Sequence, residues 1–153
     1  MSHEILLAIN VDAASDRVFE ILSTTEGQRA FWTSNCEVAG DHARFGFEDA
    51  PVDLEVSVDT EPNNLVRMQV QSGFPFWDGS TWEWELRPNS DHENCTTVIF
   101  RHRGFGDGIA ENDLGGTAQT WAMTLQHLAN YVTTGIPLPY FSASQIRPTS
   151  SGN

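Results

Sequence analysis

Two stretches decide the fold: Thr81-Trp82-Glu83-Trp84-Glu85-Leu86-Arg87 and Thr97-Val98-Ile99-Phe100-Arg101-His102-Arg103. Both alternate, and alternate residues of a strand point to the same face of a sheet. One face of this pair collects Trp82, Trp84, Phe100 and His102. The other face carries glutamates on the first strand and arginines on the second. Ion pairs across the two strands would fix their register with Glu83 and Glu85 toward solvent, so the aromatic face is expected to point inward.

The same alternation extends over the preceding part of the chain. It predicts a first strand over 4–11 and further strands near 35–39, 42–48, 51–60, 64–72, 79–87 and 95–104. Turn-forming residues such as Ala39-Gly40-Asp41 and Pro88-Asn89-Ser90-Asp91 separate them. Connections this short predict an antiparallel meander, because parallel strands need a crossover of about a dozen residues.

Helical patterns occur in two regions. After the first strand, Ser15 is a candidate N-cap, and Thr25-Glu26-Gly27-Gln28 has the form of a capping box. One long pattern follows Asn112 or Asp113 as N-cap and ends before Gly135. Its apolar stripe consists of Leu114, Ala118, Trp121, Leu125, Leu128 and Val132. The predicted fold class is therefore α+β: a curved antiparallel sheet of about seven strands wrapped around a long C-terminal helix, with two short helices after strand one.

Length and charge limit the classes of function. A chain of 153 residues fits one domain, predicted over 1–136, with a tail over 137–153 that is partly ordered at most. The net charge of −13 argues against nucleic acid and anionic membranes as partners. There is no apolar run of about 20 residues, and the N-terminal residues lack the pattern of a signal peptide, so we expect a cytoplasmic protein.

Nothing in the sequence indicates a catalytic residue, a metal or a cofactor. Cys36 and Cys95 form no CxxC pattern and are expected to be reduced thiols. The five histidines show no metal-ligand spacing, and no pair of catalytic carboxylates can be identified. The glycine-rich stretch 104–108 lacks the lysine of a phosphate-binding loop and is typical of a turn.

The inward aromatic face has two interpretations. Large rings can fill the space between sheet and helix at normal packing density, or they can surround a ligand cavity. His102 is the single inward polar residue on its strand, as is common for a hydrogen-bonded core histidine. The connecting segment 72–79 carries Phe74, Phe76 and Trp77. These rings indicate a pocket rim or lid, although a loop plug or a dimer contact would also bury them.

This order of elements resembles the START-like superfamily, which includes polyketide cyclases, birch-pollen allergens and lipid-transfer proteins. Within it, the chain is similar to the family of homologues of the activator of heat-shock-protein-90 ATPase. The likeness spans about residues 3–135. It is carried by Ala14–Leu22 with Phe31-Trp32, by Trp82 and Trp84, and by Trp121, Leu125, Leu128 and Tyr131 at helical spacing.

The resemblance implies a pocket under the long helix. Matching positions place Trp32, Phe45, Phe47, Met68, Trp82, Trp84, Phe100, His102, Trp121 and Leu125 around it, and Phe74 and Trp77 of the connecting segment complete the candidate ligand-binding set. The leading hypothesis is non-enzymatic binding of a small hydrophobic or aromatic molecule. Two alternatives stay open: a cyclase- or hydrolase-type enzyme with His102 as acid and base, and a chaperone co-factor, homodimer or other protein-interaction module.

Overall fold

The computed structural model of the chain describes residues 3–47, 50 and 52–141. Within them, seven strands form one antiparallel sheet in the order β1-β7-β6-β5-β4-β3-β2. The strands are β1 (Glu4–Val11), β2 (Asn35–Ala39), β3 (His42–Gly46), β4 (Leu54–Glu61), β5 (Leu65–Ser72), β6 (Thr81–Pro88) and β7 (Thr96–Arg103). The meander runs from β2 to β7, and β1 pairs with the far side of β7.

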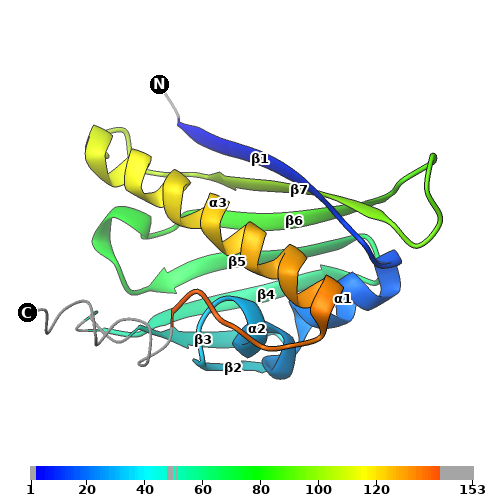
Figure 1. The fold of residues 1–153 in the computed structure, drawn as a ribbon. Coiled ribbons are helices and arrows are strands. Elements are labelled where there is room, and N and C mark those ends of the chain that lie inside the picture. The colour runs from blue at the N-terminus through cyan, green and yellow to red at the C-terminus, as the bar shows by residue number, and fades with distance from the viewer. Residues whose placement is uncertain (1–2, 48–49, 51, 142–153) are drawn as a thin grey trace, which may run out of the picture.

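The helices lie against one face of this sheet. The long helix α3 (Glu111–Thr134) crosses the concave face, while α1 (Ser15–Ser23) and α2 (Thr25–Phe31) connect β1 to β2. A short 3-10 helix, η1 (Pro75–Trp77), connects β5 to β6 at the same end of the sheet as the start of α3 (Figure 1). The predicted α+β architecture is therefore confirmed: the curved sheet wraps around the long helix, an arrangement called a helix-grip fold.

The strand bounds agree with the prediction to within two residues except at the start of β4. The strand expected over 51–60 begins only at Leu54, where pairing with Phe45 of β3 starts. Val52 is exposed and lies outside the strand, although it continues the apolar alternation. Periodicity alone could not show that the neighbouring strand offers no partner there.

The helix caps also differ from the prediction. Ala14, not Ser15, is the cap residue of α1, and the Ser15 hydroxyl instead forms a hydrogen bond with the Thr96 hydroxyl of β7 at 3.2 Å. Thr24, not Thr25, caps α2, with its hydroxyl oxygen accepting from the backbone N–H of Gly27 at 3.1 Å.

Long-range contacts explain the shift at α2. The Thr25 hydroxyl donates to the Val38 carbonyl at 3.1 Å and accepts from the Val38 backbone N–H at 2.8 Å.

Neither Asn112 nor Asp113 caps α3, because the helix begins at Glu111 after Ala110. Gly135 ends α3 as predicted, with a left-handed φ of 71°.

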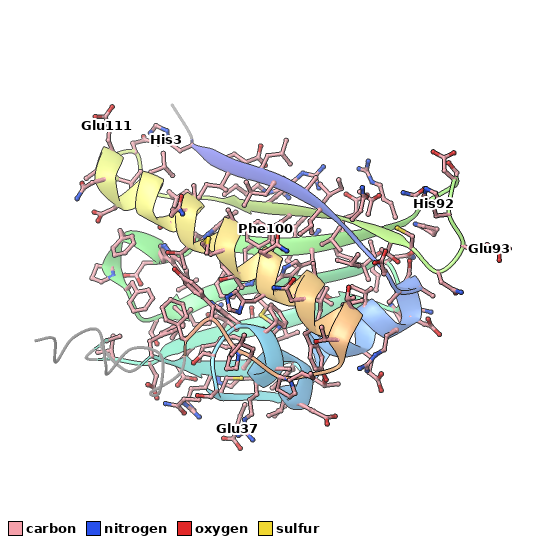
Figure 2. The ribbon with its side chains drawn as sticks, viewed as in Figure 1. His3, Glu37, His92, Glu93, Phe100 and Glu111 are labelled. Carbon is pink, nitrogen blue, oxygen red and sulfur yellow. The ribbon has the colours of Figure 1, made fainter. Side chains whose placement is uncertain are left out.

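The interior between sheet and α3 is filled over most of its length. Trp82, Trp84 and Phe100 are fully buried, and Figure 2 shows Phe100 behind the middle of α3. From the predicted stripe of α3, Trp121, Leu125 and Leu128 are buried, whereas Leu114, Ala118 and Val132 are partly buried against the core. The filled-core interpretation therefore holds for the central part of the sheet.

The outer face of the sheet carries the predicted ion pairs. Glu83 lies directly opposite Arg101 and accepts from Arg67, Arg101 and Arg103 at 3.0–3.5 Å. Glu85 accepts from Arg101 at 2.9 Å. The Glu83 side chain is only 8% exposed, so it lies beneath its arginines rather than in solvent as expected.

We predict that Glu83→Gln lowers the free energy of unfolding by about 1–3 kcal/mol, because three guanidinium groups lose their shared charged acceptor. The partial exposure of these arginines sets the lower end of this range. Glu37 of β2, which is exposed and labelled in Figure 2, is the matched control. Glu37→Gln should change stability by less than about 0.5 kcal/mol in the same urea titration. Equal effects of the two variants would contradict a role for the ion-pair cluster in stability.

Candidate functional site

A cavity of about 410 Å³ lies against the first half of α3. This volume falls within the range of about 300–1,000 Å³ that is usual for small-molecule sites. Five parts of the chain meet around it: α3, the η1 segment, the end of α2, the chain around the end of β3, and the segment that follows α3 (Figure 1). The lining residues are Trp32, Phe47, Ala50, Phe74, Phe76, Trp77, Asn112, Asp113, Gly116, Thr117, Thr120, Trp121 and Phe141.

Aromatic rings form most of the wall. Trp77 stacks on Trp121 with ring centroids 6.0 Å apart and planes 11° from parallel. Trp32 also packs on Trp121, with ring centroids 4.9 Å apart. At the mouth, Phe74 and Phe76 stack on each other at 6.0 Å, and Phe76 is 39% exposed. The cavity is therefore walled by indole rings at depth and by phenyl rings at its rim.

The η1 segment is tied to α3 by hydrogen bonds. The Trp77 indole N–H donates to the Thr117 hydroxyl at 3.1 Å, and that hydroxyl donates to the Asp113 carbonyl at 2.8 Å. Trp77 is buried, although it belongs to a short connection. The segment 72–79 therefore contributes to the cavity wall through a fixed ring.

His102 is held by hydrogen bonds on both ring nitrogens. Its Nδ1 accepts from the Trp121 indole N–H at 3.0 Å, and its Nε2 lies 2.8 Å from the Ser80 hydroxyl oxygen. Ser80 donates its own proton to the Trp77 carbonyl at 2.6 Å. His102 must then carry its proton on Nε2 and donate to Ser80.

This arrangement gives His102 a structural role. The residue is fully buried, and burial lowers the pKa of its imidazole to about 3. Its one acceptor nitrogen is occupied by Trp121, and it does not line the cavity. The geometry therefore provides no free base at this position for a cyclase- or hydrolase-type reaction.

We predict that His102 stays neutral in the folded protein down to about pH 4. Because an unfolded histidine has a pKa of about 6.5, the unfolded chain binds the extra proton first, and stability attributable to His102 falls as pH drops from about 6.5 toward 3. Imidazole ¹⁵N NMR should show Nδ1 unprotonated and Nε2 protonated from about pH 6.5 down to about pH 4. The chemically denatured protein supplies the reference titration. A folded-state titration near pH 6.5 would rule out the proposed hydrogen bonding.

The structure brings some of the sequence-predicted site residues together at the cavity. Five of them line it: Trp32, Phe47, Phe74, Trp77 and Trp121. The other seven lie in the buried core outside the cavity wall: Phe45, Met68, Trp82, Trp84, Phe100, His102 and Leu125. Sharing the inward face of the sheet is therefore not sufficient to reach the cavity.

Other lining residues were not in the predicted set. They include Phe76 and the α3 residues Asn112, Asp113, Gly116, Thr117 and Thr120. A signal for part of this group was present in the sequence, since Gly115-Gly116 interrupts an otherwise strong helical pattern. Glycine lowers helix stability by about 1 kcal/mol relative to alanine, so a glycine pair inside a helix calls for an explanation.

The segment after α3 completes the wall. The backbone N–H groups of Leu138, Tyr140 and Phe141 donate to carbonyls of Ala30, Phe31 and Trp32 at 2.7–3.0 Å. This places the Phe141 ring on Phe47 with centroids 5.0 Å apart. The other residues of the predicted tail, 142–153, lie outside the described residues. A domain boundary at 136 stays a prediction.

Among the described residues, no group of three or more His, Cys, Asp or Glu side chains could hold a metal ion. Cys36 and Cys95 are free thiols, and burial raises the pKa of Cys36 to about 11.

Over residues 3–47, 50 and 52–141, no helix is both long enough and apolar enough to cross a membrane. A cytoplasmic location stays a prediction.

Solved structures with the same architecture exist. The solution structure of the Aha1 dimer from Colwellia psychrerythraea is 23% identical with a TM-score of 0.73, and the match covers 87% of this chain and 98% of that chain. SSP2350 from Staphylococcus saprophyticus is 20% identical with a TM-score of 0.70, covering 89% and 96%. The chain has an Aha1-like fold.

A third neighbour is DynU16, a protein in the dynemicin biosynthetic locus. It is 21% identical with a TM-score of 0.67, and the match covers 88% of this chain and 48% of DynU16. No protein-family model matches the sequence, and the search of curated proteins finds no relative. At these identities the three neighbours establish the fold alone, so the function has to be inferred from the cavity.

Proposed function

We propose that this chain binds a small apolar or aromatic molecule in the cavity against the first half of α3. The observation that carries the proposal is a space of about 410 Å³ in which seven of the lining residues are aromatic. Small-molecule sites are concave and mostly apolar, with a few polar groups that fix orientation. Here the polar groups are the hydroxyls of Thr117 and Thr120 and the side chains of Asn112 and Asp113.

The Trp32 side chain favours a ligand that carries a hydrogen-bond acceptor. Its indole nitrogen is buried and has no acceptor among the described residues. Trp82 and Trp84 share this property, but they lie in the packed core, whereas Trp32 is part of the cavity wall. An unsatisfied buried donor costs about 1–3 kcal/mol, so a ligand carbonyl or ether oxygen near Trp32 would be stabilised there.

The glycine at position 116 leaves the adjoining part of the cavity free of a side chain. A Cβ atom placed on Gly116 would meet no atom within 4 Å, so close packing does not explain the glycine. The same holds for Gly115, which does not line the cavity. Larger residues at 116 would project into the space that the rings enclose.

We predict that Gly116→Leu weakens binding of N-phenyl-1-naphthylamine, a neutral aromatic dye, by about tenfold or more, because the leucine side chain occupies ligand volume. Folding should be unharmed, since leucine is the better helix former by up to about 1 kcal/mol. The measurement is a dye-fluorescence titration alongside thermal unfolding.

Gly115→Leu is the matched control. It changes the neighbouring residue of the same helix in the same way, and its side chain also meets open space, but it lies outside the cavity wall. Dye affinity should equal that of the wild type. Loss of affinity in both variants, or in neither, would contradict binding at this cavity, and absence of any saturable dye binding by the wild type would count against the proposed function itself.

Self-association is the second candidate function, because the Colwellia psychrerythraea neighbour is a dimer. The exposed ring of Phe76 at the cavity rim is available for such a contact. Sedimentation over a range of concentrations distinguishes the two roles. A ligand-binding monomer keeps the same sedimenting mass at all protein concentrations. For a functional dimer, the sedimenting mass rises with protein concentration.

A further inference from the structure

We propose that the cavity selects its ligand by charge and takes an aromatic molecule that carries an amine or another cationic group, in preference to a carboxylate. This inference rests on the proposed binding function and specifies its ligand class. It comes from the charges around the cavity rather than from its shape.

Asp113 is the only charged side chain among the described residues that line the cavity. It is half-buried in the first turn of α3, and no side chain among residues 3–47, 50 and 52–141 donates a hydrogen bond or forms an ion pair with its carboxylate. A carboxylate ligand would lose hydration in this cavity and face a second negative charge. An ammonium group would find an acceptor there.

Positive side chains are absent from the described cavity wall. The chain contains no lysine, and its eight basic residues are all arginines. Five of these lie on the outer face of the sheet, where each forms an ion pair: Arg44, Arg67, Arg87, Arg101 and Arg103. Arg17 and Arg29 belong to α1 and α2 and do not line the cavity. No described arginine is therefore positioned to neutralise an anionic ligand.

The aromatic wall favours the same sign of charge. The faces of indole and phenyl rings carry negative electrostatic potential and attract cations, tryptophan most strongly. Trp77 and Trp121 lie beside the turn that carries Asp113, since Trp77 is bonded through Thr117 to the Asp113 carbonyl. Aromatic faces next to one carboxylate form a suitable environment for an ammonium group.

One effect opposes this selection. The N-terminus of α3 carries a partial positive charge of about half an elementary charge from the helix dipole. Glu111 and Asp113 in the same turn contribute two full negative charges, which exceed it. The net charge of −13 adds a long-range attraction for cations. The local and the overall potential therefore have the same sign.

The test compares three probes that share one bicyclic ring at pH 7: 2-naphthylmethylammonium, neutral 2-naphthalenemethanol and anionic 2-naphthoate. Equilibrium dialysis or calorimetry measures their affinities. The wild type should bind the ammonium about tenfold or more tightly than the carboxylate, with the alcohol between them. High salt should weaken binding of the ammonium and leave the alcohol unaffected.

Asp113→Asn keeps the size of the side chain and removes its charge. It should lower the affinity for the ammonium about tenfold, to the level of the alcohol, and leave the alcohol unchanged. Glu111→Gln is the matched control, because it removes one charge from the same helical turn at a residue outside the cavity wall. Figure 2 shows the Glu111 side chain directed away from the body of the molecule. It should preserve the order of the three probes.

Three results would overturn the charge selection: equal affinity for the three probes, preference for the carboxylate, or equal effects of the two variants. Binding of N-phenyl-1-naphthylamine but none of the three probes would overturn the ligand class and leave the proposed function standing. Binding of neither the dye nor the probes would overturn the proposed function, and the inference with it. If Asp113→Asn fails to fold, the probe order and salt response of the wild type decide the question.

Discussion

The contact of Trp121 with the sheet is the constraint on which the rest of the structure depends. Its indole N–H donates to His102 at 3.0 Å, and its ring packs on Phe100 at 4.5 Å and on Trp32 at 4.9 Å. A directional bond combined with close ring contacts fixes both the height and the rotation of α3 over the sheet. Once α3 is fixed in this way, the residues one turn earlier, Thr117 and Gly116, must line the cavity.

The side chains of α3 explain why the space between the helix and the sheet is open at one end and filled at the other. Toward its C-terminus the inward positions are Leu125 and Leu128, both buried against the sheet. Toward its N-terminus the corresponding positions are the small residues Gly116, Thr117 and Thr120. The same sheet therefore supports a close-packed core under the C-terminal half of the helix and a cavity beside part of its N-terminal half. Trp121 stands at the boundary and contributes to both.

Alternation was sufficient to predict the strands, the inward face and the ion pairs between β6 and β7, because these follow from a period of two and from charge. It could not separate the cavity from the core, because that depends on the height of α3 over each strand. Thr24 replaced Thr25 as the cap of α2 because Thr25 meets Val38, 13 residues away. The partners of His102 come from two other elements, and no local pattern connects Ser80 with Trp121.

The hydrogen bonds around Trp77 decide which part of the rim can move. Its ring is bonded to Thr117, and its carbonyl accepts from Ser80, which accepts in turn from His102. Displacing Trp77 would break both connections and expose a buried indole. Phe76 has ring contacts with Phe74 and Trp77 and is already 39% exposed, so moving it breaks far less. A ligand that entered past the Phe74 and Phe76 rings would leave the Trp121–His102 contact intact, and with it the geometry of the cavity floor.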